Sequence, residues 1–114
     1  MNTLPDIHLS DHLILLGGRC QLSFKDILFI EAQRSYTVFW RVNGEYVMTS
    51  RPLGWYESSL PDYLVRVHKS YIVNLNYVVS FKDTTIRLID GRQVMVSRRR
   101  KSFINKFLRA HLNI

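Results

Sequence analysis

Three pairs of adjacent turn-forming residues divide the chain into short ribbons, and they constrain its fold more than any other feature of the sequence. The pairs are Gly17-Gly18, Asn43-Gly44 and Asp90-Gly91. Glycine and asparagine tolerate the positive φ that both central residues of a two-residue type I′ turn require. Because each pair lies between two apolar segments, we expect three antiparallel β-hairpins that turn at these positions.

The segments beside these turns alternate between two faces, as β-strands do. Residues 36–42 place Val38 and Trp40 opposite Phe39, and residues 84–89 alternate in the same way. This period of two residues argues against a helix and predicts strands with one buried face. Further segments rich in β-branched and aromatic residues, and therefore expected to be strands, are 27–31, 64–67 and 76–81.

Two segments have helical spacing instead of alternation. Residues 52–60 carry Pro52 in the first turn and stop before Pro61, which indicates a short internal helix. Residues 98–112 follow Ser97, a residue suited to cap a helix N-terminus, and their apolar face predicts a helix laid against a sheet. That face consists of Phe103, Ile104, Phe107, Leu108 and His111. The expected fold is mainly β, with antiparallel hairpins, one short internal helix and a C-terminal amphipathic helix.

The chain is strongly basic, and its charge is unevenly distributed. Its 114 residues, 46% of them hydrophobic, suffice for one compact domain. Sixteen Lys and Arg against nine Asp and Glu give a net charge of +7 at pH 7. Residues 82–114 hold nine of the basic side chains and only two acidic ones. This excess indicates a polyanionic partner, with nucleic acid or an anionic membrane surface as the leading classes.

Several protein classes receive no support from the sequence. Cys20 is the only cysteine, so neither a disulfide framework nor a zinc ribbon is expected, and a reducing cytosol fits best. The longest aliphatic runs, residues 13–16 and 27–30, are far shorter than a membrane span, and the N-terminus lacks a basic signal region. His8 and His12 lack a helical setting for a metal site, and no catalytic motif is present. We expect a cytoplasmic protein without enzymatic activity, metal, cofactor or small-molecule substrate.

Four consecutive cations directly after Ser97 form the most informative segment. Arg98, Arg99, Arg100 and Lys101 would occupy the first turn of the expected helix, where they oppose the positive helix dipole at a cost of about tenths of a kcal/mol each. The placement becomes favourable when a phosphate binds, because backbone N–H groups, dipole and guanidinium groups then face one anion. We favour this anion site over the simpler alternative, a solvated basic face.

Residues 66–74 form a second candidate, in which a polar stretch leaves one apolar segment and enters another. His68 and Lys69 are candidates for hydrogen bonds to base edges or phosphates. Asn74 has an amide suited to adenine, but for Ser70 and Asn74 we favour hydrogen bonds to the backbone of an irregular turn. Lysine is almost never fully buried without a partner, so Lys69 is expected at the surface.

A third, weaker candidate follows the strand expected at residues 27–31. Gln33, Arg34, Ser35 and Tyr36 place short donors and an arginine at a strand junction, where loops often carry function. Tyr36 also begins an alternating strand and fits a core position. Taken alone, this segment does not distinguish a binding loop from a structural turn.

The residues of these segments, in their order and spacing, resemble the LytTR DNA-binding domain of bacterial transcription regulators over about residues 12–110. The resemblance is carried by Asp26-Ile27-Leu28-Phe29-Ile30-Glu31-Ala32, Ser35-Tyr36-Thr37, residues 53–60, Arg66-Val67-His68-Lys69-Ser70-Tyr71-Ile72-Val73-Asn74, Asp90-Gly91 and Val96-Ser97-Arg98-Arg99. Residues 66–74 and 96–99 are the specific part, since hairpins occur in many folds. The family implies a LytTR-like fold of small packed sheets whose loops, rather than a recognition helix, enter successive major grooves.

The resemblance also assigns DNA contacts to residues of the candidate segments. It implies base contacts by Arg34, Ser35, Tyr36, His68, Lys69, Arg98 and Arg99. We expect phosphate contacts from Ser70, Ser97, Arg100, Lys101 and Lys106. Lys69 stands where the family commonly has arginine or asparagine, and lysine keeps the charge but lacks the planar fork suited to reading a base.

Domain organisation is the point at which this chain departs from the family. Members usually carry an N-terminal receiver domain, whereas only residues 1–11, an expected arm, precede the LytTR-like domain expected at residues 12–114. As a whole protein, the chain would be a stand-alone regulator under a separate partner, for example a membrane-bound inhibitor, or under its expression level. As an excised domain, its control would lie in other sequence.

We expect two copies, as a homodimer on double-stranded DNA, to bind repeated half-sites about 10.5 bp or a multiple apart. Two alternatives stay open at this level. One is a module that stacks on RNA or on single strands, which the 12% aromatic content would also suit. The other is a small interaction domain whose basic patch meets an acidic protein or lipid headgroups.

Overall fold

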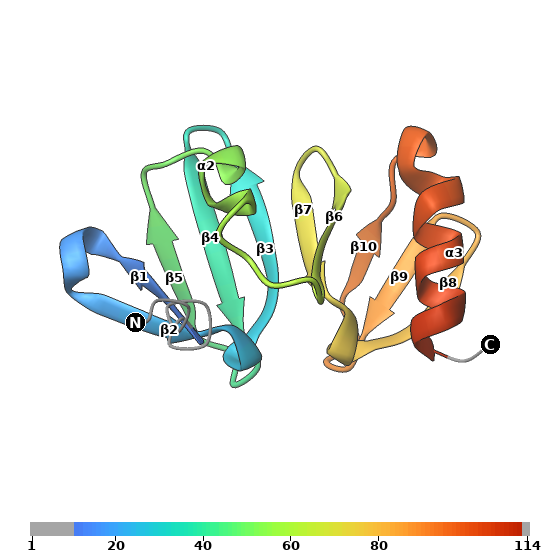
Figure 1. Ribbon diagram of the computed structural model, residues 1–114, viewed down its shortest axis with the longest axis horizontal. Coiled ribbons are helices and arrows are strands. Elements are labelled where there is room, and N and C mark those ends of the chain that lie inside the picture. The colour runs from blue at the N-terminus through green and yellow to red at the C-terminus, as the bar shows by residue number, and fades with distance from the viewer. Residues whose placement is uncertain (1–10, 113–114) are drawn as a thin grey trace, which may run out of the picture.

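The computed structural model describes residues 11–112, which form three antiparallel sheets arranged side by side (Figure 1). The strands are β1 (His12–Leu15), β2 (Cys20–Ser23), β3 (Ile27–Gln33), β4 (Tyr36–Arg41), β5 (Tyr46–Thr49), β6 (Leu64–His68), β7 (Tyr71–Asn74), β8 (Val78–Lys82), β9 (Thr85–Leu88) and β10 (Gln93–Met95). The central sheet has the order β5-β4-β3-β7-β6. The β1–β2 hairpin lies on one side of it, and a sheet of order β10-β9-β8 lies on the other. The prediction of a mainly β fold of small antiparallel sheets is confirmed.

The first hydrophobic core lies between the β1–β2 hairpin, the central sheet and the short helix α2 (Leu53–Glu57). Leu22 from the hairpin and Phe39 from β4 are buried there together with Leu53 and Tyr56 of α2. The Tyr56 ring meets Phe39 edge-on with 5.0 Å between ring centroids. Its hydroxyl shares a 2.6 Å hydrogen bond with Thr49 Oγ1 on β5, so α2 is anchored to the sheet at two points.

The second core lies between β6 and β7, the three-stranded sheet and helix α3 (Lys101–Leu112). Ile104 and Leu108, one turn apart on α3, are both 0% exposed and pack with Ile86 and Leu88 of β9. Complete burial of such side chains contributes about 1.5–3 kcal/mol each to the free energy of unfolding. This core fixes α3 against the last sheet, as the amphipathic pattern predicts.

Strand β4 is buried on both faces, although its alternation predicts one exposed face. Val38 is 1% exposed and Phe39, which points the other way, is 0% exposed. The central sheet has cover on both sides: the first core takes the Phe39 face, and on the other face Trp40 is stacked with Phe29. The guanidinium of Arg92, from the β9–β10 turn, lies 4.1 Å from the Trp40 ring centroid and links the two sheets. Tertiary packing therefore overrides the polar face that the pattern suggests.

The three predicted hairpins are present, but their turns are not of the predicted two-residue type. In the β4–β5 turn only Gly44 has positive φ, at 94°, and Gly44 N donates to Arg41 O at 3.0 Å. Asn43 Oδ1 accepts a 2.9 Å hydrogen bond from Glu45 N instead of adopting a left-handed backbone. The β9–β10 turn repeats this arrangement around Gly91, at φ 92°. Asparagine and aspartate thus serve as side-chain acceptors, which is their other role in turns.

The β1–β2 connection also departs from a two-residue turn. A 3₁₀ turn over Leu16–Gly18 places Leu16, Gly17 and Gly18 in succession at positive φ. The sequence pattern does not predict three further hairpin turns, which contain no glycine. These turns are Arg34-Ser35, Lys69-Ser70 and Asp83-Thr84. Strand β7 follows the Lys69-Ser70 turn and lies between β3 and β6 in the central sheet. The sequence pattern does not predict this strand, because polar residues directly precede it.

The expected helices are shorter than the sequence pattern predicts. Residues 98–100 form a 3₁₀ turn, so α3 begins at Lys101 and only that cation lies in its first turn. The Ser97 side chain makes no capping hydrogen bond there, and its carbonyl accepts from Arg100 N at 3.0 Å. Phe103 is 57% exposed and His111 is exposed, so the apolar face is narrower than expected. None of the helices within residues 11–112 has the length and apolar character needed to cross a membrane.

Candidate nucleic-acid interface

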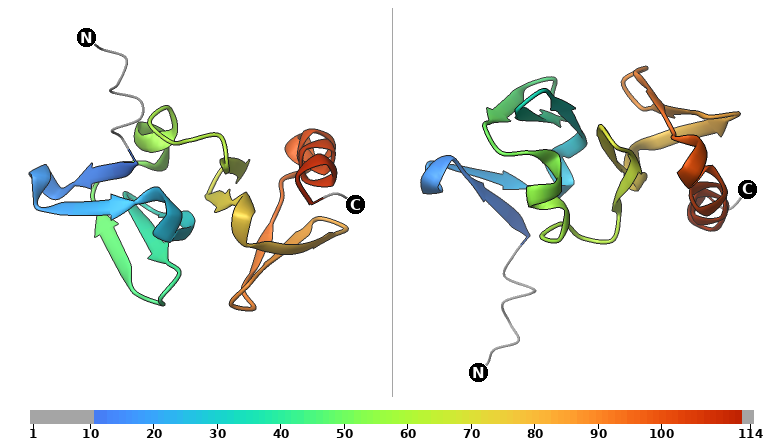
Figure 2. Two further views of the ribbon diagram at one scale, coloured as in Figure 1. Left: turned by 60° about the horizontal axis from the view of Figure 1, so that its bottom comes forward. Right: turned by 90° about the horizontal axis from the view of Figure 1, so that it is seen from above.

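The three segments singled out in the sequence lie along one edge of the molecule. In Figure 1 the β3–β4 turn, the β6–β7 turn and the start of α3 are all at the top, and the view from above in Figure 2 shows them following one another across the molecule. We call residues 34–36, 68–70 and 97–101 the upper edge. The β4–β5 and β9–β10 turns, residues 43–44 and 90–91, form the lower edge on the opposite side.

The β3–β4 turn presents its side chains to solvent. Gln33 of β3 pairs with Tyr36 of β4, so Arg34 and Ser35 form a two-residue turn, and Arg34 has a left-handed backbone with φ 56°. Arg34 and Ser35 are exposed, and Tyr36 is 48% exposed rather than part of the core. A non-glycine residue at positive φ carries local strain, which Arg34 shares with Leu16 and Asp83 outside the upper edge.

The β6–β7 turn is organised by hydrogen bonds from Arg66 and His68. The Arg66 guanidinium donates to His68 O at 2.9 Å and to Lys69 O, so the carbonyls of the last β6 residue and the first turn residue point to one side chain. Ser70 N donates to His68 Nδ1 at 3.0 Å. Because a backbone N–H can only donate, the neutral His68 ring carries its proton on Nε2, which leaves an N–H donor for a ligand. Lys69 is exposed at the tip of the turn.

Four cations follow one another at the surface or near it, three in the 3₁₀ turn before α3 and one at the first residue of α3. Arg98, Arg99 and Lys101 are exposed, whereas Arg100 is half-buried and its Nη1 donates to Arg66 O at 3.2 Å. Lys101 N closes the 3₁₀ turn by donating to Arg98 O. This turn already uses the N–H groups of Arg100 and Lys101, so an anion would be held mainly by the arginine side chains.

Backbone hydrogen bonds connect the three segments. Ala32 N, near the end of β3, donates to Ser70 O at 2.9 Å, and Ser97 N donates to Val67 O at 2.9 Å. A register irregularity between Arg66 and His68 interrupts the β6–β7 ladder at this point. Bulges of this kind re-aim side chains near functional sites. The result is one surface with a shallow depression of about 330 Å³, lined by His68, Lys69, Ser97, Arg99 and Arg100.

The upper edge carries cations that no carboxylate neutralises. Among residues 11–112 none of the upper-edge cations forms an ion pair, and Arg66 Nη1, beside this edge, pairs with Glu57 Oε1 of α2 at 2.6 Å. At this edge, the exposed cations without an ion-pair partner in residues 11–112 are Arg34, Lys69, Arg98, Arg99 and Lys101. Convergent unpaired guanidinium and ammonium groups create a positive potential suited to a phosphate backbone.

The structure brings together all but one of the twelve residues singled out for DNA contacts. The exception is Lys106, which is exposed about one and a half turns into α3, away from the upper edge. Ser70 contacts its neighbours through its backbone, as described above. Asn74 is buried, with Nδ2 donating to Ile27 O at 2.9 Å and Oδ1 accepting from Asn76 N, so the favoured backbone role of Asn74 is confirmed.

Sequence reasoning missed Arg66 and Glu57 as supports of the site. Arg66 lies inside the specific motif, but the motif alone does not say that its side chain folds back onto the turn. One partial signal was present: the Lys69-Ser70 turn contains no glycine or asparagine, which often complete a turn by themselves. Hydrogen bonds with the Arg66 and His68 side chains hold it instead.

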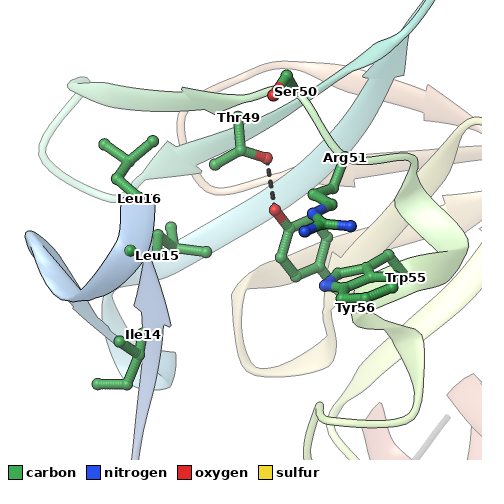
Figure 3. A pocket seen from close by; sticks show the side chains of 9 residues that line it. Ile14, Leu15, Leu16, Thr49, Ser50, Arg51, Trp55 and Tyr56 are labelled. Atoms are coloured by element: carbon green, nitrogen blue, oxygen red, sulfur yellow. Dashed lines mark hydrogen bonds between the residues drawn. The ribbon is translucent and has the colours of Figure 1, made fainter.

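A second hollow of about 300 Å³ lies away from the upper-edge residues, between the tip of the β1–β2 hairpin and α2 (Figure 3). Its walls include Ile14, Leu16 and Trp55, and the Arg51 guanidinium lies 4.1 Å from the Trp55 ring centroid.

The pKa of the Tyr63 phenol, which packs against both cores, is raised by burial and by the neighbouring charge of Asp11. Neither feature contributes to the upper edge.

Comparisons with known proteins agree with this geometry. The sequence profile described as the LytTr DNA-binding domain matches residues 17–109. Among solved structures, the fold is similar to the LytTr DNA-binding domain of a protein described as a methyl-accepting/DNA response regulator from Bacillus cereus. The TM-score is 0.70 at 25% sequence identity, and the match covers 90% of this chain and 95% of the other. No curated protein matches the chain.

Proposed function

The chain belongs to the LytTR DNA-binding domain family, and on that premise we propose that it is a sequence-specific transcription regulator that reads double-stranded DNA with its upper edge. The family is one of DNA-binding domains, not of enzymes. The observation that carries the proposal is the convergence of three cation-bearing segments, far apart in sequence, on one surface. We place its action in the bacterial cytoplasm.

Base reading is assigned to the exposed loop residues. The major groove is about 12 Å wide and admits loops of this size. Arg98 and Arg99 have the bidentate geometry that suits guanine O6 and N7. His68 Nε2–H is a single donor to the same acceptors, and the Lys69 ammonium has three donors but lacks the planar fork. Arg34 and its neighbours Ser35 and Tyr36 would enter from the β3–β4 turn.

Phosphate contacts are assigned to the residues around these loops. Lys101 is exposed at the start of α3, and Arg100 uses Nη1 for its bond to Arg66 O, which leaves Nε and Nη2 for a phosphate. Ser70, Ser97 and Lys106 complete the proposed set. Such contacts supply affinity and register without reading sequence.

Binding by two copies is the expected mode. Two copies bound at half-sites separated by about 10.5 bp or a multiple would meet the same face of the duplex. Control by a separate regulatory partner belongs to the same proposal.

The proposal is tested by selecting bound fragments from a random pool of duplex DNA and titrating the selected sequence. A Lys69→Ala, Arg98→Ala, Arg99→Ala triple variant is expected to lose at least about 100-fold in affinity, since each base contact accounts for about 1–3 kcal/mol. The charge-matched control replaces Lys25, Lys82 and Arg87, which are exposed cations outside the upper edge, with alanine.

The control is expected to keep its preference for the selected sequence. Equal losses in the two triple variants would show a general charge effect and contradict the assigned surface. Tighter binding of a single strand of the same sequence than of the duplex would support the RNA or single-strand alternative instead.

A further inference from the structure

We propose that Arg66, held by Glu57 of α2, is a positioning residue that sets the sequence preference of the upper edge by fixing the β6–β7 turn. The inference rests on the proposed function and deepens it. Arg66 is not expected to touch DNA, because its guanidinium is turned inward onto protein acceptors. Its side chain is 16% exposed.

The Arg66 guanidinium makes three hydrogen bonds to protein acceptors. Three different nitrogens are used: Nε donates to His68 O at 2.9 Å, Nη2 to Lys69 O, and Nη1 to Glu57 Oε1 at 2.6 Å. A planar fork can serve three acceptors lying in different directions, whereas a lysine ammonium on a flexible stem cannot hold the same arrangement. The conformation of the turn that carries His68 and Lys69 therefore depends on arginine at this position.

The carboxylate that pairs with Arg66 lies on a helix that is fixed to the central sheet. Glu57 is the last residue of α2, and α2 is anchored by Tyr56, whose hydroxyl bonds to Thr49 (Figure 3). Leu53 of the same helix is buried in the first core. The carboxylate that orients Arg66 thus belongs to an element held in the first core and not to the flexible tip of a loop.

Arg66 and its neighbour Val67 are also connected to residues 97–101. The Arg66 carbonyl accepts from Arg100 Nη1 at 3.2 Å, and the adjacent Val67 carbonyl accepts from Ser97 N at 2.9 Å. Arg66 is therefore joined through its side chain to one reading segment and through its backbone to another. The ion pair with Glu57 fixes the direction of the Arg66 guanidinium between these two segments.

The test compares Arg66→Lys with Arg41→Lys, which makes the same substitution in an arginine paired with Glu45 at the lower edge. Affinity is measured for the selected sequence and for unrelated duplex DNA. Arg66→Lys is expected to weaken the selected sequence about tenfold, part of the value of a base contact. Unrelated DNA is expected to be bound within about twofold of wild type, with an unchanged salt slope, because the net charge and the phosphate contacts remain.

Two further measurements separate positioning from a general structural role. In a His68→Ala, Lys69→Ala background the Arg66→Lys effect should disappear, because the substitution acts through those side chains. Glu57→Ala, a change at an exposed residue that leaves the core intact, should reproduce a smaller loss of preference while the thermal unfolding midpoint stays near wild type.

Equal losses for selected and unrelated DNA, an effect that persists in the His68→Ala, Lys69→Ala background, or no effect at all would overturn the inference. A loss of preference in Arg41→Lys equal to that in Arg66→Lys would overturn it as well. Failure of the proposed function has a different signature, since the wild-type protein itself would then show no preference among duplex sequences.

Discussion

The upper and lower edges of the molecule are built from hairpin turns of two different kinds. At the lower edge, Gly44 and Gly91 take the left-handed backbone, and the neighbouring Asn43 and Asp90 accept hydrogen bonds from main-chain N–H groups two residues on. At the upper edge, the turns Arg34-Ser35 and Lys69-Ser70 contain no glycine, and the second is held by the neighbouring side chains of Arg66 and His68. The lower turns are completed by their own residues, whereas the Lys69-Ser70 turn is also tied to distant residues, to Glu57 through Arg66 and to Ala32 N through Ser70 O.

The charges differ in the same sense. Lower-edge Arg41 pairs with Asp26 at 3.8 Å and with Glu45 at 3.1 Å, and Arg92 pairs with Asp90 at 3.1 Å. Upper-edge Arg99 and Lys69 are exposed without such a partner in residues 11–112. Cations that pair within the fold serve its structure, and cations that do not are available to an anionic ligand. The contrast between the edges is the charge difference that supports the upper edge as the proposed interface.

The largest expected effect comes from removing one upper-edge guanidinium. Arg99→Ala should lower affinity for the selected DNA by about 1–3 kcal/mol and relax the preference at one base position. Titration against a panel of single base-pair changes in the selected sequence measures both. The Arg87→Ala variant, which removes an exposed arginine elsewhere, is the matched control, and unchanged affinity and selectivity of the Arg99 variant would contradict the base-reading role.

The next effect concerns stability at the lower edge. Gly91→Ala should reduce the free energy of unfolding by about 1–2 kcal/mol, because alanine is strained in the left-handed backbone that Gly91 adopts at φ 92°. DNA affinity of the folded variant should not change. Urea denaturation checks the first expectation.

Gly54→Ala is the control for the Gly91 substitution, since Gly54 lies in α2 with open space around it and has no positive φ. It should raise stability by about 0.5–1 kcal/mol through helix propensity. Equal destabilisation by both substitutions would mean that backbone conformation is not the cause.

Arg34→Gly should move stability and binding in opposite directions. Glycine relieves the left-handed strain at φ 56°, so the free energy of unfolding should rise by up to about 1 kcal/mol. Affinity for the selected DNA should fall, because a base-reading side chain is lost. Urea denaturation and DNA titration of the same preparation measure the two changes. A rise in both stability and affinity, or a fall in both, would contradict the assignment of Arg34 as a strained residue that reads a base.

The smallest effect is expected for Lys106, which lies off the upper edge. Lys106→Ala should weaken all duplex sequences alike and lower the slope of log affinity against log salt by about one unit, if its ammonium meets a phosphate. Affinities measured at several salt concentrations give the slope. A change confined to the selected sequence would instead place Lys106 at a base.

The residue pattern predicts the burial and the turns of some elements correctly and fails for others. Alternation at Ile86 and Leu88 correctly predicts the buried face of β9, and Asn43-Gly44 and Asp90-Gly91 correctly locate two hairpins. The same alternation fails at β4, where cover on both faces buries Val38 and Phe39 together. A residue pattern encodes which side chains could be buried, but the number of layers around a strand depends on the whole fold.

The candidate site divides in the same way. A run of cations after Ser97 and a polar break at His68 are visible in the sequence, and with the family resemblance they identify the segments to examine. Their arrangement on one surface depends on Ser97 N reaching Val67 O and Ala32 N reaching Ser70 O, contacts between residues about 30 to 40 positions apart. The sequence around one residue of such a contact does not indicate which distant residue it will bond to.

By itself the sequence determined where the chain turns, which residues alternate, and that a surplus of positive charge follows the last strands. Those properties are local, since backbone conformation and side-chain period depend on a residue and its near neighbours. Only the tertiary structure decided that β7 inserts between β3 and β6, that Arg66 folds onto the turn beside it, and that three cation-bearing segments meet at one edge. The reason is that burial and long-range hydrogen bonding select among many pairings that the local pattern leaves equivalent.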